Sequence, residues 1–144
     1  MNTSMNEFPL LDPNNGIPLF YPHIPKKAIE YVSDTLQSRW LGQGPKVEQF
    51  ERKFEEKFLV DHAAIAVGSG TDALHLSYLL AGIKQGDEVI VPVFTCTATN
   101  IPLLYLGAKL VFADIDSRTM NVSVDDIRSK ITENTRAIVC VDYG

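Results

Sequence analysis

Residues 68–74 read GSGTDAL and stand between two apolar segments, a short one at 63–67 and a longer one that ends near residue 81. Small, flexible residues at such a junction are typical of the turn between a β-strand and an α-helix. The start of a helix presents free backbone N–H groups and the positive end of its dipole, and the hydroxyl groups of Ser69 and Thr71 add further donors. The stretch therefore predicts a strand, a turn suited to a phosphate group, and a buried helix. A plain turn that needs glycine for its backbone angles is the alternative.

The segments after this turn alternate between two patterns of secondary structure. Runs rich in β-branched residues indicate strands, and apolar residues three and four apart indicate helices. Ser123, with Asp126 three residues later, also has the pattern of a helix N-terminus. The expected order is strand 63–67, helix 72–81, strand 88–93, helix 97–106, strand 109–115, a helix from residue 124, and strand 136–141. Alternation of this kind predicts an α/β fold with a parallel sheet covered by helices on both faces.

Two amphipathic helices are expected before the sheet. Apolar residues recur at helical spacing over 29–36 and again over 47–58, and a break with two glycines and a proline separates the two stripes. Pro25 suits the first position of the earlier helix, which should end near Ser38. We interpret the phenylalanines of the second stripe as core residues, because stripes at this spacing normally face a core.

The predicted domain organisation has two parts. Residues 1–22 are rich in proline, which removes backbone donors and fixes φ, so we expect an extended arm there. Residues 23–144 should form one domain, with a helical lead-in over 23–60 and a βαβαβαβ segment over 61–144. Its fourth strand would run out near the last residue, and a parallel sheet needs another helix to cover that strand. We therefore expect this domain to be incomplete.

Composition narrows the class of protein. The net charge is -5 and the lysines and arginines are scattered, which argues against a nucleic-acid partner or an anionic membrane surface. Apolar runs are too short to cross a bilayer, and no signal-peptide pattern is visible, so we expect a cytoplasmic protein. Cys96 and Cys140 do not form a metal-type pair or a disulfide framework, and the three histidines share no spacing. No metal site is predicted.

A dinucleotide site is a possible but weaker interpretation of the glycine-rich turn. Gly68, Gly70 and Ala73 match the loose fingerprint, which also needs an acidic residue at the end of the next strand to hold a ribose. Asp87 and Glu88 lie at the start of that strand instead. The sequence therefore disfavours a nicotinamide or flavin cofactor.

Several short motifs follow one another in a characteristic order. They are WL at 40–41, GP at 44–45, FE at 50–51, GSGTDAL at 68–74, GDEVI at 86–90, GA at 107–108, VFADID at 111–116, IT at 131–132 and TRAI at 135–138. From about residue 17 to residue 144 the chain resembles the DegT/StrS family of nucleotide-sugar aminotransferases, which depend on pyridoxal 5′-phosphate (PLP). The resemblance implies the aspartate-aminotransferase fold, fold type I, with this chain as a truncated, N-terminal part of the large domain.

The resemblance implies roles for individual residues. Ser69, Gly70, Thr71 and the backbone N–H of Asp72 would hold the PLP phosphate, in agreement with the anion site inferred from the turn itself. Cys96 stands where the family has an aromatic side chain stacked on the pyridine ring, and a cysteine offers less contact area. We expect Cys96 to lie against the cofactor, and Phe94 is a candidate to compensate for the missing ring.

Four other residues receive structural interpretations. Asp114 and Asp116 follow a strand, and we expect them to make hydrogen bonds within their loop. Trp40 should pack on its glycine-rich loop, with a place in a sugar-nucleotide site at a dimer interface as the alternative. Cys140 is interpreted as a small core residue in the last strand.

The implied activity needs residues that this sequence does not contain. In the family, the lysine that forms the Schiff base and the aspartate at the pyridine nitrogen lie beyond the position of Gly144, so no catalytic residue is assigned. The resemblance implies transfer of an amino group from glutamate to a nucleotide-linked keto sugar by a homodimer. Two alternatives stay open: a sugar dehydratase of the same family, and a non-catalytic half-protein or binding fragment.

Overall fold

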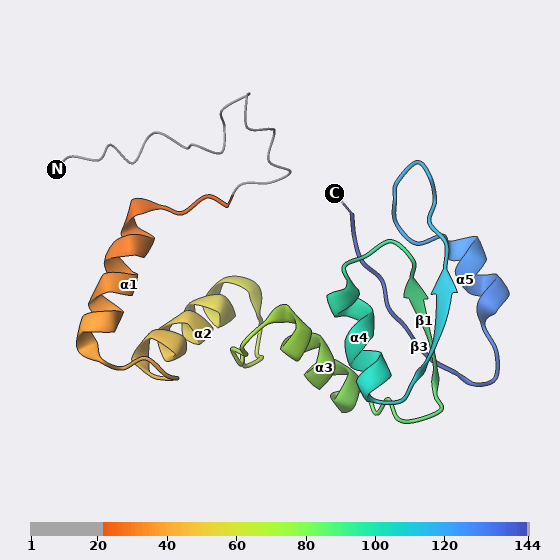
Figure 1. Ribbon diagram of the computed structural model, residues 1–144, viewed down its shortest axis with the longest axis horizontal. Coiled ribbons are helices and arrows are strands. Elements are labelled where there is room, and N and C mark those ends of the chain that lie inside the picture. The colour runs from red at the N-terminus through yellow and green to blue at the C-terminus, as the bar shows by residue number, and fades with distance from the viewer. Residues whose placement is uncertain (1–21, 144) are drawn as a thin grey trace. The chain divides into compact units, whose positions relative to one another are not determined.

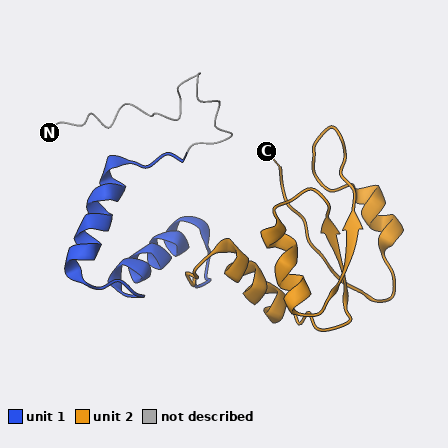
Figure 2. Cartoon of the chain, in the orientation of Figure 1, with its two compact units in different colours: residues 1–63 blue, residues 64–144 orange. Residues whose placement is uncertain are grey.

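A computed structural model describes residues 22–143. These residues divide into two compact units, one up to Ala63 and one from Ala64 (Figures 1 and 2). Of the predicted extended arm, only Pro22 falls within the described residues. The division into a helical part and a sheet-containing part has its boundary close to the one expected from the change in sequence pattern.

The first unit consists of the two amphipathic helices that the sequence predicts. Helix α1 spans Lys26–Ser38 and helix α2 spans Pro45–Phe58. Pro25 directly precedes α1, and Pro45 is the first residue of α2, where its missing N–H costs no hydrogen bond. Neither helix contains a buried residue. The predicted core role of the phenylalanine stripe is therefore not realised within this unit.

Trp40 packs on the glycine-rich connection between these helices, as predicted. Its indole Nε1 donates a hydrogen bond to the carbonyl oxygen of Gln43 at 3.0 Å. A Cβ atom at Gly44 would lie 2.2 Å from the same nitrogen, so only glycine leaves room for the ring. The connection is thus shaped by one aromatic side chain.

The second unit is a parallel α/β layer. Its elements in chain order are α3 (Gly70–Leu80), β1 (Glu88–Pro92), α4 (Thr97–Tyr105), β2 (Lys109–Ala113), α5 (Val124–Lys130) and β3 (Thr135–Ile138). The sheet has three strands in the order β2-β1-β3, and both pairs are parallel. The central strand β1 therefore exchanges hydrogen bonds on both of its edges.

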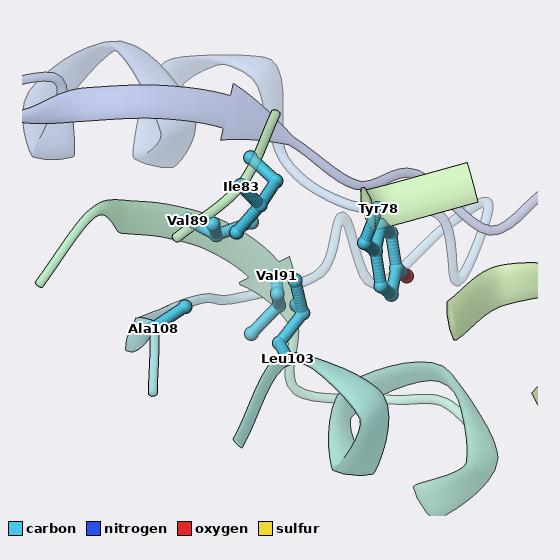
Figure 3. Close-up of a cluster of buried hydrophobic side chains, with 6 residues drawn as sticks. All are labelled: Tyr78, Ile83, Val89, Val91, Leu103 and Ala108. Atoms are coloured by element: carbon cyan, nitrogen blue, oxygen red, sulfur yellow. The ribbon is translucent and has the colours of Figure 1, made fainter. Parts of the chain in front are cut away.

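Helices cover both faces of this sheet, as the alternating pattern predicts. Val89 and Val91 point to one face, where they pack with residues of α3 and α4 (Figure 3). Ile90 points to the other face and packs with Ala113 and with Ile127 of α5. Successive side chains of a strand alternate between faces, so one short apolar strand anchors two separate clusters.

The predicted strand at 63–67 is not a strand, and the sheet has three strands instead of four. A strand exists only when a neighbour accepts and donates its backbone hydrogen bonds. The three described strands pair only with one another, and Ile65 in this segment is 80% exposed. A short apolar run alone does not distinguish a strand from irregular backbone, which explains the error.

The interpretation of Cys140 as a core residue is also wrong, because β3 ends at Ile138 and Cys140 is exposed. Val139 still donates to the carbonyl oxygen of Ile90 at 2.8 Å. The next residue of β1 on that edge is Pro92, which has no N–H to continue the ladder. The pairing of β1 with β3 therefore stops before Cys140.

A buried carboxylate ties the three strands together at their amino ends. Glu88 accepts a hydrogen bond from Lys109 Nζ at 2.7 Å and another from Thr132 Oγ1 at 2.6 Å. Lys109 begins β2, and Thr132 lies just before β3. The hydrogen bond from Lys109 is the largest cause that lowers the pKa of Glu88 below its ordinary value, and the bond from Thr132 lowers it further. Glu88 is thus an ionised clamp across the whole sheet.

The packing predicts different roles for two neighbouring leucines of α4. Leu103 is fully buried and Leu104 is 57% exposed. Leu103→Ala should lower the free energy of unfolding by about 2–5 kcal/mol, because it leaves a cavity against β1. The matched variant Leu104→Ala should change it by less than about 0.5 kcal/mol in the same urea titration. Equal losses for both variants would contradict the described orientation of α4.

The clamp predicts a pH-dependent contribution to stability. Since the pKa of Glu88 is lowered in the folded state, its stabilisation is present above the pKa of the unfolded chain and is lost as the pH falls through the folded-state pKa. Glu88→Gln should therefore melt below the wild type at neutral pH, and the gap should close on acidification. Thermal melts between neutral and acidic pH measure this. A gap that stays constant with pH would show that the carboxylate charge is not responsible.

Candidate functional site

The start of α3 is a capped helix N-terminus with free donors. Ser69 is the N-cap, and its Oγ accepts a hydrogen bond from the backbone N–H of Asp72 at 3.1 Å. Its carbonyl oxygen accepts from Ala73 at 3.1 Å. Within residues 22–143, no hydrogen bond occupies the backbone N–H groups of Gly70 and Thr71. Two adjacent donors at the positive end of the helix are therefore available to an anion.

Space around the two glycines differs in a way that matters for a ligand. A Cβ atom at Gly70 would meet nothing within 4 Å, so an incoming group can approach this backbone closely. A Cβ atom at Gly68 would lie 2.9 Å from Oδ2 of Asp72, whose side chain turns back over that glycine. The open side of the turn is thus at Gly70, and the carboxylate of Asp72 lies beside Gly68.

The predicted phosphate ligands are placed together, with one difference. Ser69, Gly70, Thr71 and Asp72 are consecutive at the start of α3, as expected. The N–H of Asp72, however, already donates to Ser69. The hydroxyl proton of Ser69 and the N–H groups of Gly70 and Thr71 are the donors that remain. This donor set and the open space at Gly70 fit a phosphate group.

Cys96 occupies the N-cap of α4, at the carboxyl end of the central strand. Its thiol is exposed and makes no capping hydrogen bond to the helix. On either side of it, the hydroxyl groups of Thr95 and Thr99 are hydrogen-bonded at 2.8 Å. Cys96 therefore faces solvent from a well-ordered helix start, but it presents no ring to a planar ligand.

One contact joins the two helices that carry these residues. The Tyr78 hydroxyl, on α3, donates to the carbonyl oxygen of Thr99 on α4 at 3.0 Å. Burial raises the pKa of Tyr78, so the phenol remains the proton donor. Among the described residues, no hydrogen bond links Ser69–Asp72 directly to Cys96. The two halves of the predicted site are connected through the packing of α3 against α4 and the hydrogen bond between Tyr78 and Thr99.

Phe94, which the sequence analysis singled out, forms an aromatic pair with Tyr143, which it did not. The rings of Phe94 and Tyr143 have centroids 4.7 Å apart and are tilted by 31°. Phe94 follows β1 and Tyr143 follows β3, so both stand at the carboxyl ends of neighbouring parallel strands. Ligands of open α/β sheets bind at this edge, and an aromatic residue directly after a predicted strand was the available signal for Tyr143.

Asp114 and Asp116 make hydrogen bonds within their loop, as predicted. Asp114 Oδ1 accepts from the N–H of Ile115 at 2.8 Å, and Asp116 Oδ1 accepts from the N–H of Arg118 at 2.8 Å. The Arg118 side chain lowers the pKa of Asp116. These contacts agree with the structural roles expected for both carboxylates.

Two searches of the described residues complete the picture of possible sites. No group of three or more His, Cys, Asp or Glu side chains in residues 22–143 is arranged to hold a metal ion. In the same residues, no helix combines the length and apolarity needed to cross a bilayer.

Comparison with known proteins identifies a family over most of the chain. The family model described as the DegT/DnrJ/EryC1/StrS aminotransferase family matches residues 22–144. The GDP-perosamine synthase of Escherichia coli O157:H7 is 45% identical over 130 residues, which is 89% of this chain and 35% of the relative. The chain therefore spans about a third of the length of the curated relatives it matches.

Solved structures share the fold at similar coverage. Spr1654 from Streptococcus pneumoniae, named as a sugar aminotransferase and determined in its PLP form, has a TM-score of 0.76 and 35% identity, covering 85% of this chain and 31% of that one. A GDP-4-keto-6-deoxymannose-3-dehydratase with a trapped PLP-glutamate geminal diamine has a TM-score of 0.75 and 29% identity, covering 85% and 33%. The expected fold, part of a PLP-dependent transferase of fold type I, is confirmed.

The anion site predicts a selective effect of charge at the N-cap of α3. Ser69→Asp keeps a residue that caps helices well, so the free energy of unfolding should change little. Its carboxylate should repel an anion at Gly70 and Thr71, so inorganic phosphate should no longer raise the melting temperature as it does for the wild type. The matched variant Ser123→Asp, at the N-cap of α5, should keep the phosphate effect. An unchanged phosphate response in Ser69→Asp would refute this site.

Proposed function

Because the chain belongs to the DegT/DnrJ/EryC1/StrS aminotransferase family, we propose that the protein carrying it is a PLP-dependent enzyme that transfers an amino group to a nucleotide-linked keto sugar. One observation carries the proposal. The unoccupied N–H groups at the start of α3 lie within the region that matches the family. The anion site inferred from the helix start, residues 69–71, lies within residues 22–144, which the family model matches.

The chain's own residues would bind and orient the cofactor. The Ser69 hydroxyl and the N–H groups of Gly70 and Thr71 would hold the phosphate, and the segment around Cys96 would face the ring. When bound, PLP supplies an electron sink for the bonds at the carbon that carries nitrogen. The contribution of α3 would be to anchor the phosphate, so that the cofactor stays in place while the amino donor leaves and the amino acceptor binds.

The proposal assigns no catalytic residue to this chain. Amino transfer on PLP needs a lysine that binds the cofactor and moves protons, and an acidic partner for the pyridine nitrogen. No lysine in this sequence occupies the family's matching position, and the chain spans about a third of its relatives' length. We place both groups in sequence outside this chain, so the 144-residue chain alone should be inactive.

Glutamate is the proposed amino donor, and a homodimer is the proposed assembly. The trapped PLP-glutamate species in a structural neighbour supports the choice of donor. The apolar stripes of α1 and α2, which contain no buried residue in the described part of the chain, support further association. A cytoplasmic location stays a prediction from the sequence.

A dehydratase acting on the same class of sugar is the second candidate. The observation in its favour is the neighbour that removes water from GDP-4-keto-6-deoxymannose, as its name states, and that shares the fold of this chain. Nothing in residues 22–143 separates the two reactions, because both would use the same phosphate site. The product of the reaction does separate them.

The experiment supplies the intact protein with PLP, glutamate labelled with ¹⁵N, and GDP-4-keto-6-deoxymannose as a probe. An aminotransferase should form a sugar nucleotide that carries ¹⁵N and release one 2-oxoglutarate for each product, as measured by mass spectrometry. Ser69→Asp should lose most of this activity, whereas Ser123→Asp should keep it. A deoxygenated, unlabelled sugar would establish the dehydratase instead. Absence of PLP binding would exclude both enzymes.

A further inference from the structure

The structure shows what stands beside the family position that lacks an aromatic ring. Cys96 is an exposed thiol at the start of α4, and a cysteine covers far less of a planar ligand than a phenyl or indole ring. Two residues earlier, the chain places Phe94 at the same end of the sheet. Its ring is 39% exposed even though it contacts Tyr143.

The Phe94–Tyr143 pair forms one continuous aromatic surface. The rings are tilted by 31° with centroids 4.7 Å apart, and both residues keep exposed surface beside this contact. Tyr143 is 45% exposed, and within the described residues its hydroxyl group has no hydrogen-bond partner. A planar ring that enters this edge would meet both apolar contact area and a free phenol.

The pair is held in place by all three strands. The backbone N–H of Tyr143 donates to Oδ1 of Asn121 at 2.6 Å, and Asn121 belongs to the loop after β2. That loop is itself closed by the hydrogen bond from Asp116 N–H to the Asn121 carbonyl oxygen at 2.8 Å. Figure 1 shows the connection after β1, the loop after β2 and the segment after β3 at one end of the sheet. Tyr143 is therefore positioned by contacts to the residues after β1 and β2.

We propose that the Phe94–Tyr143 pair is the ring-contact surface for the pyridine ring of the cofactor, in place of the aromatic side chain that Cys96 does not provide. The inference rests on the proposed function, because it presumes a phosphorylated pyridine held by α3. Two partly exposed aromatic residues that follow adjacent strands support this role, and one of them, Phe94, is two residues from Cys96. Phe94 and Tyr143 would be positioning residues that restrict the tilt of the ring.

The test measures binding of pyridoxamine 5′-phosphate to the intact protein, followed through the fluorescence of the ligand. This probe cannot form a Schiff base with a lysine, so its affinity reports phosphate and ring contacts alone. Tyr143→Ala and Phe94→Ala should each raise Kd about 3- to 10-fold, the range expected for loss of one aromatic contact. Tyr143→Leu, which keeps apolar volume but removes the ring, should show a similar loss if Tyr143→Ala folds poorly.

Tyr105→Ala is the matched control. Tyr105 is 72% exposed on α4 and contacts His75, away from the aromatic pair, so its removal should leave Kd unchanged. The decisive variant is the double mutant Tyr143→Ala with Cys96→Phe. If the pair replaces the missing family ring, Cys96→Phe should raise affinity more in the Tyr143→Ala background than in the wild type, whereas a purely structural role of Tyr143 predicts the same gain in both.

The outcomes separate this inference from the proposed function. Wild-type affinity in Tyr143→Ala and Phe94→Ala would overturn the inference and leave the cofactor proposal standing. An equal effect of Cys96→Phe in the Tyr143→Ala background and in the wild type would also overturn it, because the pair would then act through loop structure. A wild-type protein that does not bind pyridoxamine 5′-phosphate at all would overturn both.

Discussion

The complete burial of β1 is the constraint on which the second unit depends. Val89, Ile90 and Val91 have no exposed surface, and they point alternately to two sides. A strand in this position needs a partner strand on each edge, because its buried N–H and C=O groups must form hydrogen bonds. It also needs a helix on each face, because its apolar side chains must be shielded from water. The order β2-β1-β3 and the placing of α3 and α4 opposite α5 satisfy these needs.

Burial of this strand also decides where a ligand can bind. The clamp of Glu88 lies at the amino end, and the residues with free groups, Phe94 and Cys96, follow the carboxyl end. Stability and ligand contact are thus assigned to opposite ends of one strand, as is usual in open parallel sheets. At the start of α3, Ser69 caps the helix, and the N–H groups of Gly70 and Thr71 stay available to the anion that we propose there.

Local sequence signals predicted most of this structure. The errors concern features that depend on contacts between residues far apart in the sequence. Periodicity gave the five helices and three strands, and the Ser123 cap is present with Oγ accepting from Asp126 at 3.3 Å. The segment at 63–67 was mistaken for a strand because a short apolar run alone does not distinguish a strand from irregular backbone. The ladder end at Pro92 and the contact of Phe94 with Tyr143 likewise arise between residues far apart in sequence. The proposed phosphate site could be inferred from the sequence because all its groups are consecutive, whereas the role of Cys96 came only from family resemblance.

The central claim is that the first turn of α3 binds the phosphate of a pyridoxal-type cofactor. The most direct measurement is an amide NMR titration of the protein with pyridoxamine 5′-phosphate, with unphosphorylated pyridoxamine as the comparison. The account predicts that the largest shifts occur at the free N–H groups of Gly70 and Thr71, and only with the phosphorylated compound. Shifts of equal size with both compounds, or shifts that spare these two amides, would contradict it.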